Sequence, residues 1–199
     1  MMDLITITEL DLWRACDRQP GETYSDSRLK KLLRGRPGWT PLQVANSRSV
    51  PVVDRIWVLL RPEVLGRAAV IDLVNSWADR TVRAYALHYS RKEVESWARG
   101  WLDGTDRSIK SARATTGPMA WATYGLSGLG APGAAAWAVR AATWAVGIAT
   151  HAATNDAAYA AYAAATATAN AATHAAATAN AGAAEERGQL ADIRKILMT

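Results

Sequence analysis

Residues 156–176 read DAAYAAYAAATATANAATHAA, and this stretch decides the fold. Alanine is the strongest intrinsic helix former because it loses no side-chain entropy in a helix. Larger side chains recur here at intervals of three or four residues, as along one face of a helix: Asn155, Tyr159, Tyr162, Thr166, Asn170 and Thr173. Since each alanine buries little apolar area, we expect neighbouring helices to enclose this one closely, with its few large side chains filling the gaps.

A second alanine-rich helix is expected immediately before this one. Three large residues lie seven apart and therefore share one face: Trp137, Trp144 and His151. The sequence predicts a helix from Gly133 to about His151 and another from about Asp156, which together form a hairpin. The second helix is expected to end at Asn180–Gly182, and residues 190–197 then predict a short amphipathic helix.

Cap signals and apolar stripes predict helices in the front of the chain as well. Thr40-Pro41 is a helix start with proline at the first helical position, and Val50-Pro51 repeats the pattern. An apolar stripe over residues 65–87 predicts one long helix. Ser90 and Glu93 have the S-x-x-E spacing of a capping box, which predicts the start of the next helix.

Composition divides the chain of 199 residues into three parts within one domain. Residues 1–113 carry 19 of the 23 basic and 14 of the 18 acidic side chains, as expected for charged amphipathic helices. Between 114 and 184 there is one basic residue, Arg140, and one acidic residue, Asp156, and 185–199 returns to ordinary composition. The expected fold is a single compact all-α domain with an alanine-rich C-terminal helical hairpin or bundle.

Cysteine content and hydropathy exclude several classes of protein. The single cysteine, Cys16, excludes an internal disulfide and a Cys-based zinc cluster, and it suits a reducing cytosol. No apolar run approaches the roughly 20 residues of a membrane-spanning helix, and the N-terminus lacks the basic and apolar regions of a signal peptide. We therefore expect a cytoplasmic protein without a membrane partner.

The sequence contains no motif that indicates catalysis or a cofactor. His88, His151 and His174 are too far apart for a metal-ligand motif, although an antiparallel hairpin could bring the last two together near Asp156. The glycine-rich loop 125–133 lacks the preceding strand and the following lysine of a phosphate-binding loop. We expect no bound metal, no cofactor and no catalytic residue.

One basic run contains five cations within nine residues and no acidic residue: Arg28, Lys30, Lys31, Arg34 and Arg36. Such a cluster suits a phosphate backbone or an acidic protein surface, so these residues are candidates for binding a partner. The alternative interpretation is a solvated face without a binding role. No aromatic residue interleaves with the cluster in sequence, so we do not expect it to stack on nucleic-acid bases.

The chain has nine tryptophans and no phenylalanine. Four tryptophans lie on apolar helix faces and are expected in the core: Trp57, Trp77, Trp97 and Trp101. The two in the alanine-rich hairpin are candidates to line a groove together with their polar and aromatic neighbours: Trp137, Arg140, Trp144, Tyr159, Tyr162 and His174.

Two segments resemble an alanine-rich family encoded by phages and bacteria. They are VPVVDRIWVLLRP (50–62) and EERGQLADIRKIL (185–197), and the likeness covers roughly residues 50–199, including ARGWLDG (98–104). This chain departs from the family in carrying Thr and Asn where relatives have Trp, Arg and Asp, and in the loop 125–133. Members are labelled immunity proteins, which implies neutralisation of another protein rather than chemistry.

Three functional hypotheses follow, and the sequence leaves the partner's identity and the oligomeric state open. The first is a non-enzymatic, phage- or bacterium-encoded binding protein that neutralises or sequesters a protein partner in the bacterial cytoplasm. That partner would be a toxin, in immunity, or a host defence component, for an anti-defence inhibitor. The second is a nucleic-acid-associated protein acting through residues 28–36. The third is a small-ligand or enzymatic pocket between the alanine-rich helices, near Trp137, Tyr159 and His174.

Overall fold

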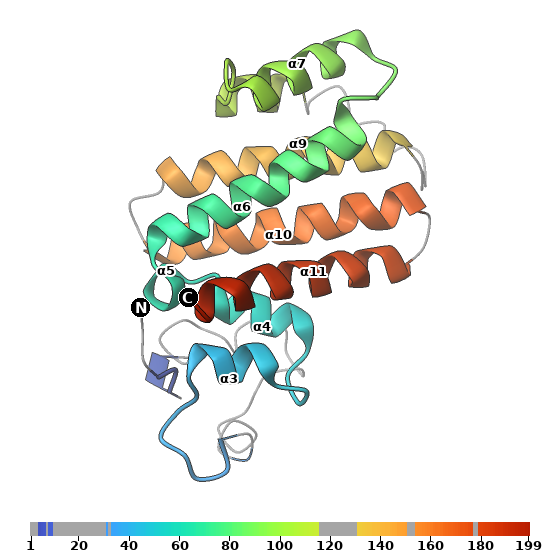
Figure 1. Cartoon of the computed structure of the whole chain (residues 1–199). Coiled ribbons are helices and arrows are strands. Elements are labelled where there is room, and N and C mark those ends of the chain that lie inside the picture. The colour runs from blue at the N-terminus through green and yellow to red at the C-terminus, as the bar shows by residue number, and fades with distance from the viewer. Residues whose placement is uncertain are drawn as a thin grey trace.

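The computed structural model describes residues 4–6, 8–9, 31, 33–115, 131–150, 154–176 and 179–199. Within these residues the fold is all-α, as predicted, and residues 109–115 are helical in addition to the labelled elements (Figure 1). The labelled elements are α3 (Pro41–Asn46), α4 (Val52–Leu59), α5 (Pro62–Leu65), α6 (Arg67–Thr81), the π-helix η1 (Val82–Ala86), α7 (Lys92–Asp103), α9 (Ala131–Thr150), α10 (Thr154–Ala176) and α11 (Ala179–Leu197).

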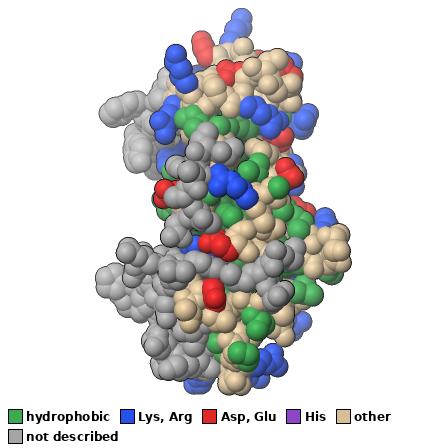
Figure 2. Space-filling view, turned by 90° about the vertical axis from the view of Figure 1, so that its left-hand side faces the viewer, with side chains coloured by type: hydrophobic (Ala, Val, Ile, Leu, Met, Phe, Trp, Pro, Cys, Tyr) green, Lys and Arg blue, Asp and Glu red, His purple; other side chains and the backbone are tan. Residues whose placement is uncertain are grey.

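Helix α10 is the centre of the domain. It lies between α9 and α11, with α6 packed across α9 and α10, and it also contacts α4 and α5 (Figure 1). Helices α3 and α4 pack against α11 at one end of the molecule, and α7 packs against η1 at the other. On the face shown in Figure 2, Lys and Arg side chains gather at the α7 end.

Alanine packing encloses most of α10, as predicted. Seven of its alanines are at most 2 % exposed: Ala157, Ala160, Ala161, Ala164, Ala165, Ala167 and Ala171. Its larger side chains behave differently, because Tyr159 is 59 % exposed and Thr166 is also exposed. The expectation that the large side chains fill gaps between helices is therefore wrong for these two residues. The alanine face packs against the neighbouring helices, and Tyr159 and Thr166 lie on an outward face, whereas Tyr162 is half-buried against the core.

The structure also corrects the end of α10. The helix ends at Ala176, and Asn180–Gly182 lies within α11, which is a helix of 19 residues rather than a short one. A Cβ on Gly182 would overlap the Thr173 hydroxyl and lie 3.1 Å from the Ala169 carbonyl oxygen. The glycine therefore permits close approach of α11 to α10 instead of ending a helix.

The helix starts in the front of the chain agree with the cap signals in part. The Thr40 hydroxyl accepts a hydrogen bond from Gln43 N at 3.2 Å, and α4 begins one residue after Pro51. The predicted capping box of Ser90 is wrong, because α7 begins at Lys92 with no side-chain cap, which places Ser90 outside the cap position. The predicted long helix 65–87 is α6 followed by η1, where Leu87 N reaches Val82 O at 2.9 Å.

The four tryptophans predicted in the core are buried there: Trp57, Trp77, Trp97 and Trp101. The Trp77 indole donates to Asp192 Oδ2 at 3.1 Å, which ties α6 to α11. The Trp101 indole donates to Asp79 Oδ1 at 2.7 Å, which ties α7 to α6. Since an indole N–H buried without a partner destabilises a protein, these carboxylates permit the deep burial of the two rings.

Several features named above fall outside the described residues: Cys16, Arg28, Lys30, His151 and residues 125–130 of the glycine-rich loop. Residues 131–133 of that loop are helical and begin α9. Among the described helices, none is both long enough and apolar enough to cross a membrane.

Replacing one enclosed alanine by leucine tests the close packing of α10. Ala161 is 0 % exposed, so we expect Ala161→Leu to overpack the interface and lower stability by about 1–3 kcal/mol. The matched control is Ala175→Leu on the exposed end of the same helix, which should be nearly neutral because leucine is a good helix former. Thermal unfolding followed by circular dichroism measures both, and equal melting temperatures for the two variants would contradict the packing.

The lowered pKa of Asp192 predicts that the folded protein loses stability in acid. Burial alone would raise the pKa of Asp192, but hydrogen bonds from Trp77 and Lys195 and the charge of Arg80 outweigh it and lower that pKa. We expect Asp192→Asn to cost about 1 kcal/mol of unfolding free energy near neutral pH. The difference in unfolding free energy between the parent and Asp192→Asn should be present above about pH 4, which is the pKa of an aspartate in the unfolded chain. It should shrink as the pH falls further.

Urea unfolding at pH 7, 5, 4 and 3 measures this difference. The control is Asp72→Asn at an exposed position of α6. A difference for Asp192→Asn that stays constant down to pH 3 would rule out the proposed ionic contribution of Asp192.

Candidate functional site

The aromatic strip is a group of five residues on the α9–α10 hairpin: Trp137, Arg140, Trp144, Tyr159 and His174. The Trp144 and Tyr159 rings meet edge to face with centroids 5.8 Å apart, and the Trp137 and His174 rings are 6.3 Å apart. The Arg140 guanidinium lies 4.8 Å from the centre of the Trp137 ring. The seven-residue spacing on α9 thus places its large residues opposite those of α10.

Exposure differs along the aromatic strip. The Tyr159 side chain is exposed, whereas the other four side chains are half-buried. Tyr162, the sixth residue predicted in this group, lies instead beside Val53 and Gln189, where α10 meets α4 and α11. The structure therefore brings together five of the six predicted groove residues, on a partly open surface.

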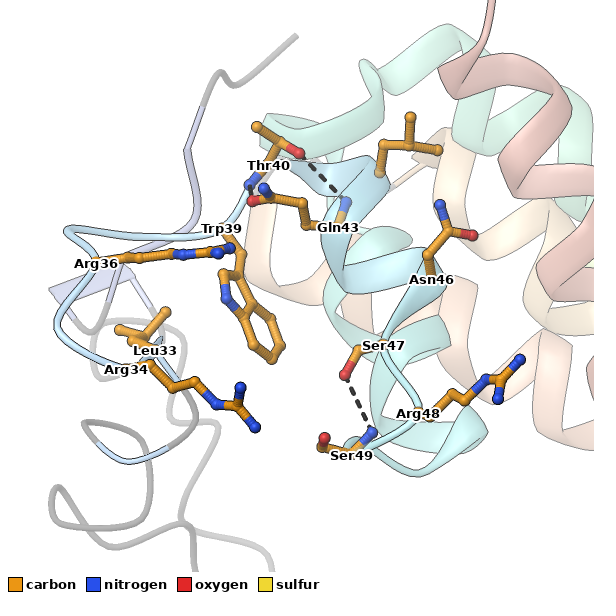
Figure 3. Close-up of a pocket in the computed structure, with 11 residues that line it drawn as sticks. Leu33, Arg34, Arg36, Trp39, Thr40, Gln43, Asn46, Ser47, Arg48 and Ser49 are labelled. Carbon is orange, nitrogen blue, oxygen red and sulfur yellow. Dashed lines mark hydrogen bonds between the residues drawn. The ribbon is translucent and has the colours of Figure 1, made fainter.

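The basic hollow is an open cavity of about 650 Å³ beside α3 (Figure 3). Two chain segments line it: residues 33–40, and α3 with the loop that follows it. The lining consists of Leu33, Arg34, Arg36, Trp39, Thr40, Leu42, Gln43, Asn46, Ser47, Arg48 and Ser49. Among the residues that the structure describes, this lining contains three arginines and no acidic residue.

The predicted basic run contributes two arginines to this hollow. Arg34 and Arg36 line it, and Lys31 is exposed but is not part of the lining. The sequence analysis missed Arg48, which lies on the opposite wall, beyond Ser47 and Ser49. The sequence does contain a sign that Arg48 belongs with this basic cluster, because the whole span 27–53 has no acidic residue.

The basic run contains no aromatic residue in sequence, but the fold brings the Trp39 ring beside it. Figure 3 shows the Trp39 ring pointing into the hollow, between the side chains of Arg34 and Arg36. Adjacency in sequence could not show this, because the chain reverses between Arg34 and Trp39. Arg34 and Gly35 both adopt left-handed backbone, with φ of 50° and 77°, which turns the chain back toward the hollow.

Backbone pairing holds Trp39 in place. Its N–H donates to Ile5 O at 3.0 Å, and its carbonyl accepts from Ile5 N at 2.7 Å. The preceding residue must be small, because a Cβ on Gly38 would lie 2.8 Å from Ile5 O. The next residue, Thr40, begins α3 with a reciprocal cap in which Gln43 Oε1 accepts from Thr40 N at 3.0 Å. The backbone of Trp39 is therefore held in place on both sides.

Two other arginines near α3 have a structural role. Arg55 on α4 and Arg194 on α11 both donate to the Ala45 carbonyl oxygen, at 3.0 and 2.6 Å. They stabilise the C-terminal end of α3, where the helix carbonyls concentrate partial negative charge. Burial, together with the charge of Arg194, lowers the pKa of Arg55.

The cations of the hollow differ from Arg55, which is buried, and Arg194, which is half-buried. Arg34, Arg36 and Arg48 are exposed, and among the described residues none of them forms an ion pair with a carboxylate. Because no carboxylate of the described residues pairs with them, these three arginines favour the approach of an anion to this side of α3.

Metal ligands are not clustered in the part of the chain that the structure describes: no three His, Cys, Asp or Glu side chains there could share an ion. His174, a metal-ligand candidate in the sequence, belongs to the aromatic strip instead.

No family model matches this chain, and no curated protein or solved structure matches it either.

Gly38→Ala tests whether the Ile5 pairing positions Trp39. The added methyl group cannot fit against Ile5 O, so we expect a loss of about 1–3 kcal/mol and faster hydrogen exchange of the Trp39 amide. Gly188→Ala on α11 is the control, since its added Cβ meets nothing within 4 Å. It should stabilise the helix by about 0.5–1 kcal/mol. Unchanged exchange at Trp39 in Gly38→Ala would contradict this role of the pairing.

Proposed function

We propose that this protein is a non-enzymatic binding protein that docks onto a protein partner through the aromatic strip and thereby neutralises it. The observation that carries the proposal is the exposed Tyr159 ring, which meets the Trp144 ring edge to face, while Arg140 stacks on Trp137 farther along α9. Tyr, Trp and Arg supply most of the binding energy at protein interfaces. The resemblance to the immunity-protein family supports the same role.

The setting of the strip suits this role physically. Two long helices that pack through alanine form its base, so the ring positions are rigid before binding. Small neighbours leave the Tyr159 ring standing above its surroundings. A pre-organised aromatic group loses little conformational entropy when it enters a partner's pocket. The partner would present an apolar recess for Tyr159 and a carboxylate for Arg140.

The setting proposed for this interaction is the cytoplasm of a bacterium, with the gene carried by the bacterium or by a phage. A bacterial toxin as partner would make the protein an immunity protein, and a host defence component would make it an anti-defence inhibitor. The third hypothesis, a pocket between the alanine-rich helices, gains no support because the facing alanines of α9 and α10 are packed together.

The test compares Tyr159→Ala with a control on the same outward face, Thr166→Ala. Tagged parent protein is used to isolate a protein partner from the producing bacterium, and calorimetry with the purified partner gives the Kd of each variant. Removing an interface hot spot costs at least about 2 kcal/mol, so Tyr159→Ala should weaken binding about 30-fold or more. Arg140→Gln should also weaken binding, and Thr166→Ala should bind as the parent does.

Neutralisation has a separate readout. Co-expression of the parent protein should restore the activity or growth that the partner alters, and Tyr159→Ala should not. A partner that binds Tyr159→Ala and Arg140→Gln as tightly as the parent would refute the assignment of this surface.

A further inference from the structure

We propose that the basic hollow binds single-stranded nucleic acid, with a base stacked on Trp39 and with Arg34, Arg36 and Arg48 contacting phosphates. This inference is independent of the proposed function, because the aromatic strip contributes no residue to the hollow. It rests on three observations about the hollow: the charge of its described lining, the position of the Trp39 ring and the placement of the arginines on two sides.

The charge of the lining selects an anion. Arg34, Arg36 and Arg48 are exposed and form no ion pair among the described residues, and the nearest acidic residues in sequence are Asp26 and Asp54. The guanidinium group matches the geometry of phosphate oxygens and is weakly hydrated, so it is suited to phosphate recognition.

The aromatic ring selects a planar group next to the anion. Trp39 points into the hollow between Arg34 and Arg36, and the Ile5 pairing fixes its backbone (Figure 3). Base stacking on aromatic side chains within a basic groove is how sequence-tolerant proteins bind single strands. An acidic protein surface would satisfy the arginines but would leave this ring without a stacking partner.

The three arginines lie on two sides of the hollow, which favours a polymeric anion over a small one. Arg34 and Arg36 flank Trp39, whereas Arg48 lies across the hollow and its side chain points away from the ring (Figure 3). Side chains that lie on two sides of the hollow and point in different directions suit successive phosphates of a crossing strand better than one phosphate group. Asn46 and Ser49 also line the hollow and are exposed, so they can hydrogen-bond to base edges.

The experiment is fluorescence anisotropy with labelled, mixed-sequence 12-nucleotide DNA and RNA at 50–200 mM salt. Three competitors distinguish the sources of binding: an abasic 12-nucleotide strand, a poly-glutamate peptide of equal charge, and free AMP. We expect the intact strand to bind tightest, and its affinity to fall with salt by a log–log slope of about −0.7 for each phosphate contacted. The DNA and RNA arms show whether the 2′-hydroxyl contributes.

Four variants separate the roles of the residues. Trp39→Leu should weaken binding about 10-fold or more, and Trp39→Phe should retain most of it because phenylalanine still stacks. Arg36→Gln and Arg48→Gln should each reduce the salt slope by about 0.7. The matched control is Arg83→Gln, an exposed arginine on η1, which packs with α7 at the opposite end of the molecule from α3. Melting temperatures establish whether each variant is folded. If Trp39→Leu does not fold, the arginine variants still test the hollow.

Four results would overturn the proposal. The first is no binding of either strand at 50 mM salt. The second is equal competition by the abasic strand or by poly-glutamate, which would identify a general polyanion or an acidic protein as the ligand. The third is binding of AMP as tight as that of the strand, which would identify a free nucleotide. The fourth is an equal effect of Arg83→Gln and Arg36→Gln, which would place the contact outside the hollow.

Discussion

The close approach of α10 to its neighbours is the constraint on which the rest of the structure depends. Helix axes can come together only as far as the side chains between them allow, and alanine and Gly182 allow a short distance. Because such a centre buries little area per residue, large side chains must supply apolar burial at its edges. Trp77 on α6 and Trp101 on α7 are buried large side chains of this kind, and each donates its indole N–H to a carboxylate.

A small set of buried polar contacts determines how α11 sits on this centre. The Gln189 amide donates to the Ala165 carbonyl at 3.0 Å and also to the Thr168 hydroxyl, both on α10. Arg194 shares the Ala45 carbonyl with Arg55. Segments 50–62 and 185–197 therefore meet at the end of α3, where these two arginines serve packing.

Sequence reasoning succeeded where the signal is local and repeated. Alanine content and spacing predicted α9 and α10, and the seven-residue interval predicted that Trp137 and Trp144 share a face. It failed where the outcome depends on distant partners. Trp39 enters the basic hollow through pairing with Ile5, 34 positions earlier in the chain, and no local pattern encodes that contact. Gly182 resembles a helix terminator in sequence, and only the position of Thr173 across the interface shows why glycine is needed.

The division of α10 into a buried alanine face and an outward face has an evolutionary consequence. A single-base change in an alanine codon yields Gly, Ser, Thr, Val, Pro, Asp or Glu. On the buried face almost all of these substitutions put a larger or a charged side chain at a position that has no room for it, so selection would remove them. On the outward face, at positions such as Thr166, threonine and its mutational neighbours are tolerated. The hairpin can therefore accept changes on its outer surface while its interior stays constant.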